Sequence, residues 1–406
     1  MARRTAQRPH DGHVVVVGGS AAGLLTATLL ARDGVPVTVL ERSPEVRPVP
    51  RTLIVTDQLR GLLGPVIDPA IRNEIRRFEL FADGRVASIA LRRPDLIVER
   101  SAIIEALHRE ATGAGVSVRS GRRFLDMRSS NGGLEVSVGV NGHGTTEEIS
   151  ASTVVGADGA RSSVARAAGW PSQPTVPLLQ AIVDLPADLP PDTTRVWFRP
   201  EDTPYFYWLI PESERRGALG LIGEDGPDAR RRLDRFLEEH GLEALEYQAA
   251  RIPRYRRWIP IHRRLGSGHV YLVGDAAGQV KVSTVGGTVT GLRGAQAAAM
   301  AILGRRARPE LRSLRRELDL HLWVRRLMHR FTVDDYRRLL DLLDGSAARV
   351  LAAHDRDDAR RVFARLALAR PRILVFGVRA GMARALSRPR PASPPPVPRA
   401  APSSPR

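Results

Sequence analysis

The segment HVVVVGGSAAGLLTATLLARDGVPVTVLER, residues 13–42, decides the fold class of this chain. Its four consecutive valines predict a strand that is buried on both faces, as strands of parallel sheets are. A glycine-rich turn and an apolar helical pattern follow at once, and VTVLE predicts a second strand. The segment is therefore a β-α-β unit and indicates an α/β fold with a parallel sheet.

The turn of this unit has the spacing of a dinucleotide-binding site. Gly18, Ser20 and Gly23 occupy the three glycine positions of G-x-G-x-x-G, with serine at the second. In that pattern the positions serve a tight turn, a close approach to pyrophosphate, and the packing of helix on strand. Glu41 ends the second strand about twenty residues on, where a carboxylate bonds a ribose hydroxyl and disfavours a 2′-phosphate.

Composition limits the other sources of chemistry. The 406-residue chain carries a formal charge of +18 and no cysteine, and Lys281 is its only lysine. Without thiols, redox chemistry requires a bound cofactor, and no metal site is predicted. No nucleic-acid-binding motif accompanies the charge, so we interpret it as arginine bias on solvated helix faces and predict no nucleic-acid partner.

Targeting features are absent from the sequence pattern. The charged N-terminus lacks a cleavage site, and no apolar run is long enough to span a bilayer, so we expect a soluble, cytoplasmic protein. Residues 305–330 interleave arginine with Leu, Trp and Met at helical spacing. This pattern leaves open a peripheral contact with the inner face of an anionic membrane.

Two further segments join the first in a known order. TVVGADGARSSVARAAG, residues 153–169, places Asp158 between a strand and a helix, and YLVGDAAG, residues 271–278, places Asp275 after another strand. The three segments resemble the motifs of flavin-dependent monooxygenases and their relatives. The resemblance implies FAD, with Asp275 on the ribityl chain and a helix N-terminus that stabilises negative charge on the reduced ring.

The stretch GDAAGQVKVSTVGG, residues 274–287, resembles more closely the geranylgeranyl reductase family, whose members reduce isolated double bonds of polyprenyl chains. Lys281 falls on the lysine of that family. All other basic residues of the chain except histidine are arginine, and the compact ammonium of lysine on its flexible stem is chemically different from a guanidinium. Val282 and Val285 depart from the proline and glycine of the family pattern. These departures leave the shape of the substrate pocket open.

An aromatic segment extends the same resemblance. In YFYWLIPESERRGALG, residues 205–220, Trp208 and Pro211 match an aromatic motif of the family, while Phe206 and Ile210 replace its other aromatic positions. The resemblance implies an apolar wall that faces a lipid chain; an ordinary buried strand would show a similar pattern. The predicted substrate-pocket residues are Phe206, Trp208, Ile210 and Lys281.

These features predict a Rossmann-like, discontinuous FAD-binding domain with an inserted antiparallel-sheet substrate domain and a helical C-terminal region. The predicted parts are 1–169 and 262–304 for the FAD-binding domain, 170–261 for the insert, 305–385 for the helices and 386–406 for a disordered tail. The predicted cofactor-binding residues are Gly18, Ser20, Gly23, Glu41, Arg42, Arg100, Asp158, Asp275, Gly286 and Gly287.

The function implied by the resemblance is FAD-dependent reduction of carbon-carbon double bonds in a hydrophobic chain. The flavin carries the chemistry, which suits a sequence without a nucleophile-base constellation. NAD(P)H acting transiently, or an electron-transfer protein, would supply electrons. The alternatives are an aromatic hydroxylase, a halogenase and a non-catalytic flavoprotein; halogenases of this type use a substrate-domain lysine, which this chain lacks.

Overall fold

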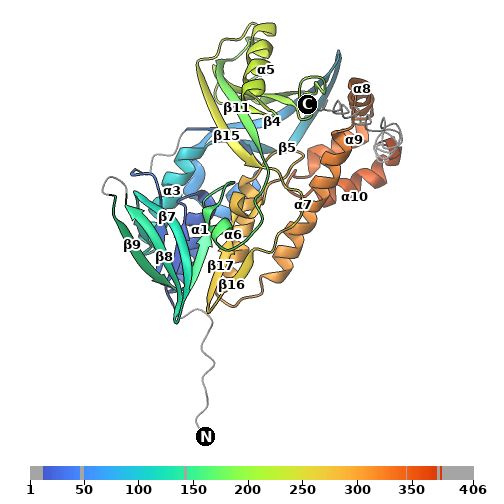
Figure 1. The fold of residues 1–406 in the computed structure, drawn as a ribbon. Coiled ribbons are helices and arrows are strands. Elements are labelled where there is room, and N and C mark those ends of the chain that lie inside the picture. The colour runs from blue at the N-terminus through green and yellow to red at the C-terminus, as the bar shows by residue number, and fades with distance from the viewer. Residues whose placement is uncertain (1–11, 46–49, 141–143, 344, 373–374, 377–406) are drawn as a thin grey trace, which may run out of the picture.

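A six-stranded sheet organises the computed structural model, which describes residues 12–45, 50–140, 144–343, 345–372 and 375–376 (Figure 1). The strand order is β16-β17-β10-β1-β2-β6, and all pairs are parallel except the edge pair of β16 and β17. The four valines of β1 are fully buried in the middle of this sheet, as their sequence predicts. The strands are β1 (Val14–Val17), β2 (Val37–Leu40), β6 (Ser117–Arg119), β10 (Thr153–Gly156), β16 (His262–Leu265) and β17 (Gly268–Leu272).

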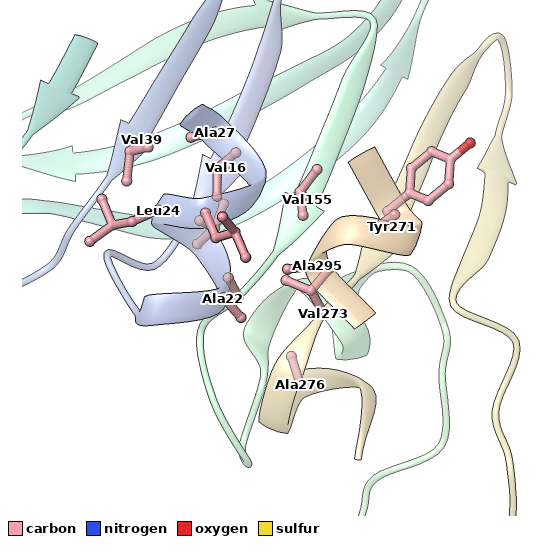
Figure 2. Packing of buried hydrophobic residues seen from close by; sticks show 14 of the residues in the cluster. Val16, Ala22, Leu24, Ala27, Val39, Val155, Tyr271, Val273, Ala276 and Ala295 are labelled. Atoms are coloured by element: carbon pink, nitrogen blue, oxygen red, sulfur yellow. The ribbon is translucent and has the colours of Figure 1, made fainter. Parts of the chain in front are cut away.

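Helices and a small sheet sandwich these strands. Helix α1 (Ala21–Arg32) packs against α3 (Arg100–Gly113) and α6 (Thr288–Ile302), and β8 of the small sheet packs on β10 and β17. Figure 2 shows Leu24 and Ala27 of α1 beside Val16 and Val39 of the parallel strands. The small antiparallel sheet contains β7 (Arg122–Ser130), β8 (Gly133–Val140) and β9 (Thr146–Ala151).

A second, eight-stranded sheet has the order β15-β11-β14-β13-β12-β4-β5-β3 and carries helix α5 (Gly226–Glu239) on β11 and β14. Its strands are β3 (Thr52–Val55), β4 (Ile71–Ala82), β5 (Arg85–Glu99), β11 (Thr175–Asp184), β12 (Thr193–Trp197), β13 (Tyr207–Pro211), β14 (Arg216–Ile222) and β15 (Glu246–Pro253). The mixed α/β fold with a mostly antiparallel second sheet agrees with the predicted fold class.

The second sheet is wider than the inserted segment 170–261. Strand β4 pairs in parallel with β12, and this pairing brings β3, β4 and β5 into the sheet. Residues 52–99, which the sequence division places in the first part of the FAD-binding domain, therefore belong to the same sheet as the insert. A parallel pair between segments more than 100 residues apart leaves no local pattern in the sequence.

The C-terminal region is helical as far as it is described. It comprises α7 (Arg308–Met328), α8 (Val333–Leu342), α9 (Gly345–Ala353) and α10 (Ala359–Ala369), and α8 begins at a capping box formed by Thr332 and Asp335. The predicted tail, 386–406, lies outside the described residues. None of the helices among the described residues is long and apolar enough to cross a membrane. The short helices are α2 (Gln58–Leu63), α4 (Ser163–Ala167), and the 3-10 helices η1 (Gly64–Ala70) and η2 (Gly274–Ala277).

Close packing of α1 on the parallel sheet yields a stability prediction. A Cβ atom at Gly23 would lie 2.3 Å from the carbonyl oxygen of Gly18 and 2.9 Å from Cβ of Ala157. We expect Gly23→Ala to lower the free energy of unfolding in urea by about 1–3 kcal/mol, because the helix must move off the strands. The control is Gly61→Ala in α2, where a Cβ meets nothing within 4 Å. This control should be neutral or stabilising by up to about 1 kcal/mol, and equal effects of the two changes would contradict the packing argument.

Candidate active site

A cavity of about 1190 Å³ borders all the motifs singled out in the sequence. Its wall includes the β1-α1 turn, the end of β2, the aromatic strand β13, the glycine-rich segment before α6, and residues of the C-terminal helices. Small-molecule sites occupy about 300–1,000 Å³, so this cavity has room for a large cofactor and part of a second ligand.

The β1-α1 turn forms one end of the cavity. Gly18 has φ 105°, and a side chain there would meet the carbonyl oxygen of Ala157 at 2.5 Å. Ser20 caps α1: its hydroxyl accepts from the Gly23 amide at 3.2 Å and donates to the Ala157 carbonyl at 3.0 Å. The N-terminus of α1 therefore borders the cavity with amides that lack intrahelical acceptors, a suitable site for a phosphate group.

Glu41 lines the cavity next to this turn and also holds the turn in place. Its Oε2 accepts from the Gly19 amide at 2.8 Å, and its Oε1 accepts from the Ser43 amide at 2.9 Å. Arg42 lines the same stretch of wall. The predicted carboxylate at the end of the second strand is thus at the cavity, with its orientation fixed by two backbone donors.

Two arginines and an aspartate meet farther along the wall. Burial raises the pKa of Asp275, while the charges of Arg51 and Arg100 oppose that rise. Burial, and then the nearby Arg100, lower the pKa of Arg51 to about 10, although Asp275 raises it. The Nε of Arg51 is buried without a hydrogen-bond partner in the described part of the protein. An anionic ligand between the two guanidinium groups would relieve both the desolvation and the like-charge repulsion.

Arg51 is a site residue that the sequence interpretation missed. It directly precedes β3, and its backbone carbonyl accepts from the Arg100 amide at 3.0 Å, so the two arginines are neighbours across the sheet. No motif surrounds Arg51 in the sequence. It is one of 62 lysines and arginines, so nothing in the sequence singles it out. Only the pairing of β3 with β5 brings it to the cavity.

Asp158 lines the cavity, but its carboxylate is hydrogen-bonded to neighbouring residues of the chain. Its oxygens accept from the Ser162 hydroxyl at 2.5 Å and from the amides of Ser163 and Val164 at 2.6 and 3.2 Å. Burial raises the pKa of Asp158, while these hydrogen bonds lower it. In this structure Asp158 binds the first two amides of α4, whose N-cap is Ser162, and it fixes the loop that borders the cavity.

The glycine-rich segment brings the N-terminus of α6 to the cavity. Gly286 and Gly287 line the wall, and a Cβ at Gly287 would lie 3.4 Å from Oδ1 of Asp275. The preceding Val285 has φ 54°, a conformation in which a β-branched side chain is an outlier. This position is the one at which the family pattern has glycine, and the left-handed backbone explains that preference physically.

The far end of the cavity is apolar. Phe206, Trp208 and Ile210 of the aromatic strand all line it, and they pack in one cluster with Val280 and Val285 of the glycine-rich segment. The alternate residues of the strand, among them Leu209, face a different cluster beneath α5. Trp208 lies directly over Gly220, where a Cβ would be 2.5 Å from the indole ring. Phe206, Trp208 and Ile210 therefore share the face of the strand that lines the cavity.

Lys281 differs from its prediction as a substrate-pocket residue. It is not among the residues that line the cavity. Its ammonium is buried and forms an ion pair with Asp357, whose other oxygen accepts from the Thr56 hydroxyl at 2.6 Å. Asp357 comes from the C-terminal helical region, so the glycine-rich segment is tied to that region by two buried charges.

This combination of a β-α-β turn, a strand-end carboxylate and a pair of desolvated arginines along one cavity is typical of a protein that binds a dinucleotide cofactor. A family model described as an FAD binding domain matches residues 11–304. Over 290 residues the chain is 32% identical to digeranylgeranylglycerophospholipid reductase 2 of Methanothermobacter thermautotrophicus, covering 68% of this chain and 73% of that protein. The chain therefore belongs to the FAD-binding domain family and, within it, to the geranylgeranyl reductase family of FAD-dependent oxidoreductases.

Two further comparisons are with proteins that are less similar in sequence. A geranylgeranyl bacteriochlorophyll reductase-like protein from Thermoplasma acidophilum has a similar fold, with a TM-score of 0.73 and 19% sequence identity over 90% of this chain and 98% of that chain. The chain is also 27% identical over 310 residues to aklavinone 12-hydroxylase of Streptomyces purpurascens, covering 66% of this chain and 57% of that protein. The resemblance seen in the sequence is confirmed.

The position of Asp275 between two arginines generates a prediction for cofactor affinity. We expect Asp275→Ala to weaken FAD binding about ten- to a hundredfold. The substitution removes the carboxylate expected to accept a hydrogen bond from the ribityl chain of FAD, and such a charge-assisted bond contributes roughly 1.5–3 kcal/mol. Equilibrium titration of the flavin-free protein with FAD measures the effect. The control is Asp225→Ala, an exposed N-cap of α5 that does not line the cavity. An Asp275 variant with the affinity of the wild type would remove this residue from the cofactor site.

The buried ion pair generates a second prediction. Lys281→Met leaves the carboxylate of Asp357 buried without its cation, and we expect a loss of about 3–5 kcal/mol in the free energy of unfolding. The double variant Lys281→Met/Asp357→Asn removes both charges and should recover much of that loss. Arg315→Met, which breaks an exposed ion pair with Asp319 at 3.4 Å, serves as the control and should cost less than about 1 kcal/mol. A double variant as unstable as Lys281→Met would contradict a charge-based explanation.

Proposed function

We propose that this oxidoreductase reduces carbon-carbon double bonds of a polyprenyl or similar hydrophobic chain. The observation that carries the proposal is the apolar end of the cavity, where Phe206, Trp208 and Ile210 form one wall. A long hydrocarbon chain needs such a wall, because it offers the protein no polar group to recognise. The similarity to the archaeal lipid reductase supports the same substrate class.

We propose that FAD binds along the polar part of the cavity. Gly18 and Ser20 would hold its pyrophosphate at the N-terminus of α1. Glu41 and Arg42 would bind its ribose end. The middle of the cofactor would lie against Arg51, Arg100 and Asp275. Gly286 and Gly287 would allow α6 to approach the ring. When bound and reduced, FAD supplies the hydride; the chain's own residues orient the substrate and exclude water.

The source of electrons and the approach of the substrate belong to the same proposal. NAD(P)H acting transiently, or an electron-transfer protein, would reduce the flavin, since the sequence has one dinucleotide fingerprint. A peripheral contact with a membrane would deliver a lipid substrate. Helix α7 supports that contact, because it is rich in arginine and exposes 44% of Trp323.

Aromatic hydroxylation is the second candidate, favoured by the similarity to aklavinone 12-hydroxylase. The two reactions differ in their use of oxygen. Anaerobic enzyme reduced with dithionite should convert a polyprenyl substrate to a product that has gained hydrogen, detected by mass spectrometry. In air, NADPH oxidation should yield hydrogen peroxide without hydroxylated product. Hydroxylation of an aromatic substrate in step with oxygen consumption would overturn the proposal.

The apolar wall can be tested by one substitution and a control on the same strand. We expect Trp208→Ala to lower kcat/KM for the polyprenyl substrate about ten- to a hundredfold, because the loss of a buried aromatic contact costs about 1.5–3 kcal/mol, while FAD content is unchanged. Leu209→Ala, on the opposite face of the strand, should lower stability and leave kcat/KM of the folded enzyme unchanged. Equal effects of both variants on kcat/KM would show that this strand is not part of the substrate site.

A further inference from the structure

A chain of polar side chains interrupts the apolar end of the cavity. The hydroxyl of Ser283 lies 2.5 Å from Nδ1 of His321, and Oε1 of Glu317 lies 3.3 Å from Nε2 of the same ring. All three residues are buried, with exposed fractions of 7%, 4% and 3%. Buried polar groups are costly unless they are paired, so this chain requires an explanation.

Two structural elements fix the geometry of the three groups. Glu317 and His321 are one turn apart on α7, and Oε1 of Glu317 also accepts from the Ala359 amide of α10 at 2.6 Å. Ser283 lies in the glycine-rich segment, between Val280 and Val285 of the apolar cluster. The carboxylate is thus held by two helices and faces Nε2 of the imidazole at ion-pair distance, although Nε2 forms no hydrogen bond in the described part of the protein. Nδ1 of the same ring contacts the serine.

One end of this chain is open to the cavity. Ser283 and His321 both line it, as does Trp208 of the apolar wall. Val280 and Val285, on either side of Ser283, pack in the same cluster as Trp208. A substrate held against that wall would therefore lie close to the serine hydroxyl.

We propose that Ser283, His321 and Glu317 form a proton relay that protonates the substrate's double bond. This inference rests on the proposed alkene reduction, which adds a hydride to one carbon and a proton to the other. The Ser283 O–H bond breaks as the new C–H bond forms, and the serine oxygen takes the Nδ1 proton of the His321 imidazolium. The imidazole is left neutral and regains its proton from solvent. Ser283 is the catalytic donor, and Glu317 is a positioning residue that stabilises the imidazolium.

Burial and nearby charges set the acidity of the His321 imidazolium. Burial is the main cause that lowers its pKa; the Lys281 ammonium lowers it further, while Glu317 and Asp357 raise it. These groups belong to α7, to the glycine-rich segment and to the residue two positions before α10. An imidazolium with a lowered pKa is a stronger acid than free histidine, whose pKa is about 6.5.

The test uses the FAD-loaded enzyme, reduced with dithionite without oxygen and mixed rapidly with geranylgeraniol in detergent micelles. Flavin reoxidation gives the single-turnover rate as a function of pH. We expect the wild-type rate to fall as the pH rises through the pKa of His321. Ser283→Ala and His321→Gln should slow the step about 10²- to 10⁴-fold, and Ser283→Thr should restore most of the rate. Glu317→Gln should move the kinetic pKa downward.

A measurement without substrate accompanies the kinetics. The ¹⁵N resonances of His321 in the oxidised enzyme give its pKa directly, and this value should equal the kinetic pKa. His329→Gln, an exposed histidine at the end of the same helix that does not line the cavity, is the control and should leave rate and pH profile unchanged. FAD content and thermal stability of each variant show that it is folded.

The outcomes separate the relay from the proposed function. Slow variants with a displaced pH profile and wild-type FAD content support the relay. Wild-type rates and an unchanged pH profile in Ser283→Ala and His321→Gln overturn the relay alone and leave alkene reduction standing. A reduced wild-type enzyme that transfers no hydrogen to any polyprenyl alkene overturns the proposed function, and the relay with it.

Discussion

The buried ion pair between Lys281 and Asp357 joins segments that lie far apart in the sequence. Lys281 belongs to the glycine-rich segment before α6, Asp357 precedes α10, and Thr56, just beyond β3, donates to the same carboxylate. A buried charge without a partner is costly, so the burial of each of these segments depends on the others. Neighbours of the pair in the chain, Ser283 and Arg356, line the cavity.

The sequence predicted the parts of the structure that depend on local patterns. The β-α-β turn, the buried strands and the alternation of the aromatic strand are each contained in a few residues, and the structure has all of them. The sequence could not reveal that β4 pairs with β12, or that the pairing of β3 with β5 brings Arg51 to the cavity. The same limit applies to Ser283 and His321, 38 residues apart, whose hydrogen bond depends on how α7 packs.

At Lys281 and Val285 the sequence pattern explains only part of what the structure shows. Lys281 is unusual as the only lysine of the chain, but its ammonium pairs with an aspartate rather than pointing into the cavity. Val285 occupies a left-handed conformation at φ 54° beside the bridge between Lys281 and Gly286. A valine is kept in that conformation only if its surroundings over-determine it, and here the side chain packs into the apolar cluster. Packing thus accounts for a residue that backbone preference alone would reject.

The two ends of the cavity differ in polarity, and the glycine-rich segment lies between them. Toward the β1-α1 turn, helix N-termini and desolvated arginines favour negative charge; toward β13, aromatic and aliphatic side chains exclude water. The proposed reduction of an isolated double bond would use both environments, together with a proton donor beside the hydrophobic chain. The Ser283-His321 pair that lines the cavity near the apolar wall is the donor that we propose. The arrangement of charge along the cavity supports this proposal.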